Sequence, residues 1–278
     1  MRAESLKWSF TIVLLCLVAA TLECGSNKPA TLPNDQLSGN WEITLQRHAH
    51  PGSLLFSGFI LQSGSAVTGS LILGSGCNGV GTVTGTVDGQ NLALTIDEFG
   101  QEISLTGTLP PDSPSGSTFI GGPFSALAGG CATYASTGTW SATPVTPISG
   151  TFHGTFVSTA SSGGFVDTFN VTGSLTQGPN TGSSNAMLTG TVTATGPPHF
   201  CPYLTSATIS GLISGTSVTL NLFDATGSQI AQVGPATITT DGASLSCSAA
   251  AAGNVCYSFP PISSSCPLEQ GAIQLSFP

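Results

Sequence analysis

Two related stretches indicate the fold of this chain: VTGTVDGQNLAL at residues 83–94 and ISGLISGTSVTL at residues 209–220. Each stretch reads apolar-x-Gly-x-apolar-x-Gly and then continues as an alternating run of apolar and polar residues. Alternation with a period of two is typical of a β-strand that buries one face. A Gly-containing turn between two such runs indicates a hairpin. The two stretches therefore predict the same hairpin in two halves of one chain.

The repeat extends outward from these stretches. The sequence SGNWEITL at residues 38–45 matches SGTFHGTF at residues 149–156, and each opens its half with alternating large apolar residues. Near the ends of the halves, Gly138-Thr139-Trp140 corresponds to Gly271-Ala272-Ile273. A repeat of this kind predicts two copies of one structural unit.

We place the first β domain at residues 37–145 and the second at residues 148–278. Pro144 and Pro147 favour an extended linker between them. In the first half, turn residues and alternation predict strands at 39–47, 53–62, 65–73, 80–87, 90–97, 102–109, 117–125 and 134–142. Regularly spaced short strands predict an all-β protein of two tandem antiparallel β-meander domains, either small barrels or sandwiches, that resemble lipocalins in outline.

The charge of the chain excludes one class of partner. Charged residues make up 6 % of the sequence, against roughly 25 % in typical soluble domains. Beyond residue 23 the only basic side chains are Lys28 and Arg47, against eleven Asp and Glu. A nucleic-acid-binding protein needs a basic surface to offset the phosphates, so we expect no nucleic-acid partner.

The N-terminus has the pattern of an export signal. Arg2 and Lys7 precede a nearly continuous apolar run from Trp8 to Leu22. This run is shorter than the roughly 20 residues that span a bilayer comfortably. A basic start, an apolar run and small residues predict a signal peptide, which we place at residues 1–23. Cleavage after Ala20 is the alternative.

Cys24 and the residues Gly25-Ser26-Asn27 that follow it resemble the processing site of bacterial lipoproteins. The resemblance covers the first thirty residues. It implies that Cys24 becomes the lipidated first residue and that the protein is anchored in the cell envelope, at the outer membrane or cell surface. Residues 24–36, which contain Pro and Asn and show no periodicity, are expected to form a tether. Free secretion is the alternative location. Neither reading implies a cofactor.

The number of cysteines supports lipidation of Cys24. The chain beyond the signal has seven Cys, and an odd number in an exported protein needs an explanation. Lipidation of Cys24 leaves six, enough for three disulfides in an oxidising compartment. Alternate turns of an up-and-down meander lie at the same end of the domain, where two Cys can come close enough to form a bridge. Because the two halves repeat each other, we expect matching bridges in both. The expected pairs are Cys77–Cys131, Cys201–Cys266 and a local Cys247–Cys256.

An alternative pairing in the second half stays open. Cys256 could replace Cys266 as the partner of Cys201, in which case Cys247 would pair with Cys266. Six Cys allow fifteen pairings, so the sequence alone does not decide between them.

His48 and His50 are the candidate metal ligands. Residues two apart on a strand share a face, so both imidazoles could reach one zinc or copper ion. Glu42 is the one possible third ligand. Because no further ligand is visible, we expect a polar pair at a strand end and no metal.

Two other groups of residues are candidate sites. Asp97, Glu98 and Glu102 surround the turn at Phe99-Gly100. Paired carboxylates serve as acid and base or bind calcium, but solvated acids at a hairpin tip are the simpler expectation. Aromatic residues at strand ends could line a ligand cup, and core packing is the expectation here too. These are Trp41, Trp140, Phe152 and Phe156.

The sequence thus favours a non-enzymatic lipoprotein of the cell envelope that acts as a binding or structural module, with no catalytic residues. Its partners would be the membrane, reached through the N-terminal lipid, and an envelope protein. The first alternative is a barrel that carries or sequesters a small apolar ligand. The second is an envelope hydrolase, which lacks a visible nucleophile and base.

Overall fold

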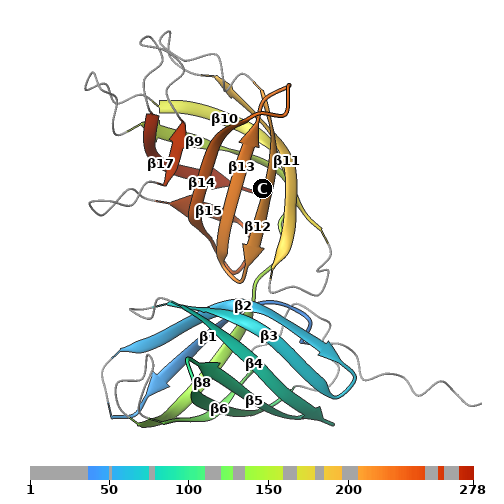
Figure 1. Cartoon of the computed structure of the whole chain (residues 1–278), viewed down its shortest axis with the longest axis vertical. Coiled ribbons are helices and arrows are strands. Elements are labelled where there is room, and N and C mark those ends of the chain that lie inside the picture. Colours follow the sequence, from blue (N-terminus) through green and yellow to red (C-terminus); the bar gives the residue numbers. More distant parts are fainter. Residues whose placement is uncertain are drawn as a thin grey trace, which may run out of the picture. The chain divides into compact units, whose positions relative to one another are not determined.

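The computed structural model describes residues 37–49, 52–74, 79–109, 120–127, 135–158, 168–178, 185–195, 206–247, 256–259 and 269–278. These residues form an all-β structure with two tandem closed antiparallel barrels (Figure 1). Both barrels belong to one compact unit, Asp35–Pro278. Among the described residues, no helix is long and apolar enough to cross a membrane.

The first barrel contains eight strands that pair in sequence order, and β1 pairs with β8 to close it. The strands are β1 (Gly39–Arg47), β2 (Ser53–Ser63), β3 (Ala66–Leu73), β4 (Gly79–Asp88), β5 (Asn91–Glu98), β6 (Gln101–Thr108), β7 (Ile120–Ala126) and β8 (Ser136–Pro144). Each lies within three residues of its predicted position. Of the two predicted architectures, the barrel is the one observed.

Apolar and polar residues alternate along the strands of this barrel, so that one face of each strand points inward and the other outward. In β5, Leu92, Leu94 and Ile96 are at most 3 % exposed, whereas the alternate residues Ala93 and Asp97 face solvent. Inward side chains from all eight strands join one buried cluster. This packed interior is the main stabilising feature of the barrel, because burial of apolar surface dominates folding.

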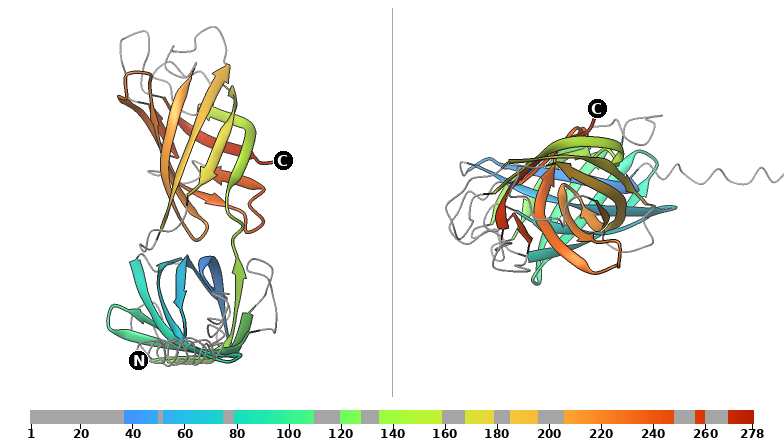
Figure 2. Two further views of the ribbon diagram at one scale, coloured as in Figure 1. Left: turned by 90° about the vertical axis from the view of Figure 1, so that its right-hand side faces the viewer. Right: turned by 90° about the horizontal axis from the view of Figure 1, so that it is seen from above.

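The second barrel contains nine strands: β9 (Ser149–Ser158), β10 (Thr168–Gln177), β11 (Ala186–Thr195), β12 (Ala207–Ser214), β13 (Ser217–Phe223), β14 (Gln229–Ile238), β15 (Ser244–Cys247), β16 (Tyr257–Phe259) and β17 (Glu269–Ser276). Pairing of β13 with β14 and of β17 with β9 closes the ring. The strands are strongly twisted in both views of Figure 2.

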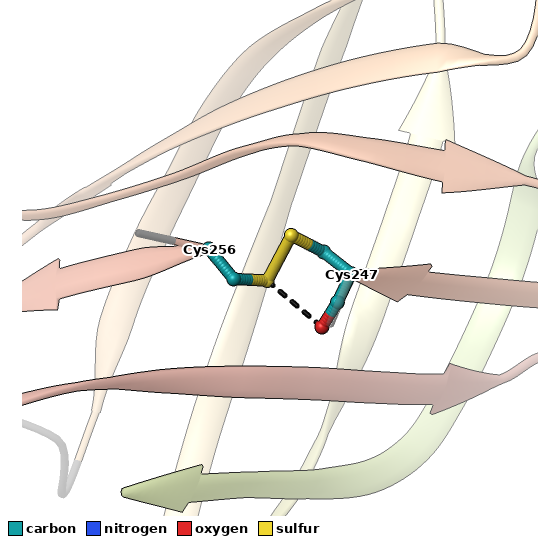
Figure 3. Close-up of a disulfide and its surroundings, with 2 residues drawn as sticks. All are labelled: Cys247 and Cys256. Carbon is teal, nitrogen blue, oxygen red and sulfur yellow. Dashed lines mark hydrogen bonds between the residues drawn. A yellow bond between two sulfur atoms is a disulfide. The ribbon is translucent and has the colours of Figure 1, made fainter. Parts of the chain in front are cut away.

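Strands β15 and β16 together fill one strand position. Both lie between β14 and β17, where Cys247 is opposite Ile273 and Tyr257 is opposite Gly271. A disulfide joins Cys247 to Cys256 with their Cα atoms 5.6 Å apart (Figure 3). This is the local bridge that the sequence predicted, and it holds the two half-strands in line. Residues 248–255, which connect them, lie outside the described residues.

The internal repeat is structural as well as sequential. Gly85 in β4 and Gly211 in β12 hold equivalent places in the repeat. Each lies very close to the backbone of the next strand. A Cβ added at Gly85 would overlap the carbonyl oxygen of Ala93, and one at Gly211 would overlap that of Thr219. Only glycine fits where two backbones approach in this way. The repeated glycines therefore mark the same tight strand pair in both barrels.

The two barrels are joined by four residues, 145–148, that form no strand. Val145 and Ile148 in this linker are only 3 % and 2 % exposed. Pro144, the last residue of β8, and Pro147 are expected to extend the chain here, and the apolar residue that follows each of them is buried as well.

Candidate functional site

The structure does not bring the possible third ligand, Glu42, close to the candidate metal ligand His48. His48 is exposed just after β1, and its backbone N–H donates a hydrogen bond to the backbone carbonyl of Thr137 at 3.0 Å. Glu42 lies six residues earlier, which corresponds to roughly 20 Å along a strand. His50 lies outside the described residues. Within the described ranges, no group of three His, Cys, Asp or Glu side chains could hold a metal ion.

The acidic turn differs from the expectation at one position. Asp97 and Glu102 are exposed, as predicted, but Glu98 is fully buried at 0 % exposure. The prediction that all three acids are solvated was therefore wrong for Glu98. The physical reason is alternation, because Glu98 continues the inward row of Leu94 and Ile96.

The four aromatic residues at strand ends belong to the core. Trp41, Trp140, Phe152 and Phe156 are 3–4 % exposed. Both indole N–H groups are satisfied, because Trp41 donates to the carbonyl of Leu37 and Trp140 to that of Thr106, each at 2.8 Å. A buried indole usually finds such a partner. Core packing, rather than a ligand cup, is their observed role.

Several predicted positions are not described by the structure. Cys24, and both members of the expected bridges Cys77–Cys131 and Cys201–Cys266, lie outside the described residues. Lipidation and these two bridges stay predictions.

A groove lies on the outer wall of the first barrel, over the seam where β1 meets β8. We call it seam groove 1; its cavity volume is about 510 Å³. Across the seam, Thr44 is opposite Ser141 and Gln46 is opposite Thr139. Beside β8, Gly121 and Gly122 in β7 have no side chains to fill the groove. The lining residues are Thr44, Gln46, Thr108, Gly121, Gly122, Thr139, Trp140 and Ser141.

A second groove, seam groove 2, lies over the seam where β9 meets β17 in the second barrel. Its cavity volume is about 470 Å³. Across this seam, Thr155 is opposite Gln274 and Val157 is opposite Ala272. The lining residues are Thr155, Val157, Pro235, Thr237, Ser246, Cys247, Ala272, Ile273 and Gln274.

The two grooves lie at equivalent positions of the repeat, although Pro235 lines only seam groove 2. The sequence repeat aligns Thr44 with Thr155 and Trp140 with Ile273, and the strand registers extend the match. Gly121 is opposite Ser141 just as Ser246 is opposite Gln274. The matched pairs are Thr44/Thr155, Gln46/Val157, Gly121/Ser246, Gly122/Cys247, Thr139/Ala272, Trp140/Ile273 and Ser141/Gln274.

The eighth lining residue follows the same rule. Continuing the β6–β7 register places Thr108 opposite Gly121, and Thr237 is opposite Ser246 in the second barrel. Every residue that lines seam groove 1 thus has a counterpart that lines seam groove 2. The two barrels therefore carry a groove at the same position of the repeat.

Both grooves offer uncharged hydrogen-bonding chemistry. Hydroxyl and amide side chains are most of the side chains that line seam groove 1, whereas in seam groove 2 they alternate with apolar residues, and neither groove has a charged lining residue. Hydroxyls both donate and accept, and a primary amide has two donors and an acceptor. The volumes fall within the roughly 300–1,000 Å³ of small-ligand sites. Such a surface suits a neutral ligand rich in hydroxyl or amide groups.

Sequence reasoning concentrated on inward residues and so missed the grooves. One signal was present, because Thr44 and Thr155 are identical within the repeated segments 38–45 and 149–156. The other walls come from strands far apart in sequence, and only barrel closure brings them together.

Comparison of the chain with protein-family models, with curated proteins and with solved structures finds no match. Interpretation of the site therefore depends on the geometry of this chain.

Proposed function

We propose that the protein is a non-enzymatic binding module of the cell envelope that holds uncharged, hydroxyl-rich polymers, the chemistry of glycan chains, in seam grooves 1 and 2. The observation that carries this proposal is the repetition of one neutral groove in both barrels. Two equivalent sites on one chain suit a repetitive ligand, because linked sites raise the overall avidity without new contacts.

The packed interior supports use of the outer wall. In the first barrel, inward residues such as Ile43, Leu71 and Leu105 are 0 % exposed and belong to one continuous cluster. Side chains fill the interior of small barrels in this way. The alternatives of an apolar-ligand carrier and an envelope hydrolase have no comparable observation in their favour.

Export and lipid anchoring are part of the same proposal. They are supported by the basic start, the apolar run and the sequence Cys24-Gly25-Ser26-Asn27. Mass spectrometry of the N-terminal peptide tests this step, and we expect a lipid-modified Cys24. An unmodified terminus at Thr21 would contradict it.

Calorimetric titration with neutral hexasaccharides (cellohexaose, chitohexaose and maltohexaose) tests the grooves. We expect two sites per chain for at least one of these sugars. Thr44→Lys and Thr155→Lys should each remove one site, because a long charged side chain would fill one groove, and the double variant should not bind. Thr189→Lys is the matched control, since Thr189 is exposed on β11 outside both grooves. Stoichiometry that is unchanged in the double variant would refute the proposal.

A further inference from the structure

The turn between β5 and β6 carries an exposed phenylalanine in an unfavourable backbone conformation. Phe99 and Gly100 both have positive φ, 54° and 82°, as in the type I′ turn that favours Asn-Gly. A side chain with a Cβ is crowded by the following carbonyl oxygen there. The ring of Phe99 lies over Gly79, yet the residue is 70 % exposed. An aromatic at this position therefore costs conformational strain and gains little burial.

Two further exposed apolar residues flank the hairpin that carries Phe99. Val80, next to the Gly79 that the Phe99 ring covers, is 59 % exposed. Leu127, just after β7, is 65 % exposed, and its N–H donates to the carbonyl of Glu102 at 3.5 Å. Val80 on β4 and Leu127 after β7 thus lie on the two sides of the β5–β6 hairpin, and exposed apolar residues gathered around one element can mark an interaction site.

Two acids lie within the same surface. Asp97 and Glu102 are directly opposite each other across the hairpin, and both are exposed. Like charges in directly opposed positions destabilise a strand pair. We call Val80, Asp97, Phe99, Glu102 and Leu127 the hairpin-tip patch.

The second barrel shows that the fold does not require such a patch. Its corresponding turn, between β13 and β14, is polar and internally satisfied. Asp224 accepts hydrogen bonds from the Thr226 hydroxyl at 2.6 Å and from the Ser228 N–H at 3.0 Å. The strain, the exposed ring and the opposed acids are thus particular to the first barrel.

We propose that the hairpin-tip patch docks a partner protein that offers an apolar pocket to Phe99 and cationic side chains to Asp97 and Glu102. We infer a partner with cationic side chains because such side chains would complement the charges of Asp97 and Glu102. A second copy of the chain would bring only Lys28 and Arg47 beyond residue 23 against eleven Asp and Glu, so its negative charge would repel the two acids. Anionic lipid would be repelled by the same acids. The inference goes beyond the glycan-binding proposal, because the patch shares no residue with either groove.

Site-specific photo-crosslinking of the full-length protein in its host cells tests the proposal. Phe99→benzoylphenylalanine places the reactive group in the patch, and Thr226→benzoylphenylalanine places it in the polar turn of the second barrel as the matched control. We expect a protein adduct from position 99 only, mapped by mass spectrometry to a segment with apolar and Lys or Arg residues. Asp97→Asn with Glu102→Gln in the same background should reduce the yield at least tenfold.

The affinity of the mapped partner then separates the contribution of the Phe99 ring from that of the acids. Phe99→Asn should raise the dissociation constant at least tenfold, since buried aromatic anchors dominate interfaces. Glu102→Lys should mainly slow association. Equal adducts from positions 99 and 226, an adduct with a second copy, an adduct with lipid, or no adduct would each overturn the proposal. None of these results depends on sugar binding, so failure of one proposal is distinguishable from failure of the other.

Discussion

Thr155 occupies in the second barrel the place that Thr44 occupies in the first: each lies on the first strand of its barrel, opposite a polar residue of the last strand. The two barrels therefore share strand order, register at the closing seam and the groove above it. This shared register predicts that equivalent substitutions have equivalent effects in the two barrels.

The repeated glycines test that equivalence. Gly85→Ala and Gly211→Ala should each lower the free energy of unfolding by about 1–3 kcal/mol, because the added Cβ meets the backbone of the next strand. Gly178→Ala is the control, since the nearest atom to its Cβ would be the Met187 carbonyl oxygen at 3.6 Å. Urea denaturation measures all three. A neutral result at Gly211 would contradict the close approach.

Removal of the disulfide should weaken the second barrel. Cys247 and Cys256 are nine residues apart, and a closed loop of this size corresponds to about 2–3 kcal/mol of unfolded-state entropy. The double variant Cys247→Ser/Cys256→Ser should lose that much stability in urea denaturation. Unchanged stability of this variant would show that strand pairing alone aligns β15 with β16.

Phe99→Asn should stabilise the first barrel. Asn tolerates the left-handed conformation that Phe99 adopts with φ of 54°, so the free energy of unfolding should rise by about 0.5–1 kcal/mol. Thermal and urea denaturation provide the measurement. A loss of stability would mean that the packing of the ring over Gly79 outweighs the strain.

Reversing one charge of the opposed acids should also stabilise the hairpin. Glu102→Lys converts the pair with Asp97 into an attractive one, worth roughly 0.2–1 kcal/mol. The gain should shrink as salt is added, because exposed charges are screened. Glu102→Gln, which only removes the repulsion, should give a smaller gain. Equal gains for the two variants would argue against direct pairing.

The polar turn of the second barrel should respond to acid. Hydrogen bonds from Thr226, then Ser228, lower the pKa of Asp224 below its usual value of 3.8. A depressed pKa stabilises the fold above the unfolded-state pKa and ceases to do so as pH falls through the folded-state value. The stability difference between wild type and Asp224→Asn should therefore be constant from pH 7 to about 5 and shrink below about 4. A difference that grows with acid would refute this assignment.

The sequence predicted the strands well because alternation is a local property. Leu92, Leu94 and Ile96 mark an inward row, and the turn glycines end each strand. The same row predicts that Glu98 faces inward, but its charge and its place beside a turn suggested exposure. Inward alternation decided the position of Glu98, which is fully buried.

The sequence by itself determined the all-β class, the repeat and the strand limits of the first half, because alternation and turn residues are properties of short stretches of chain. It also predicted the bridge between Cys247 and Cys256 but left another pairing open, and the structure decided between them. Closure of the barrels was decided only in three dimensions. It pairs Thr44 with Ser141 and Thr155 with Gln274, about a hundred residues apart. The seam grooves exist because strand register, which no local pattern specifies between the first and last strands, brings these polar side chains together.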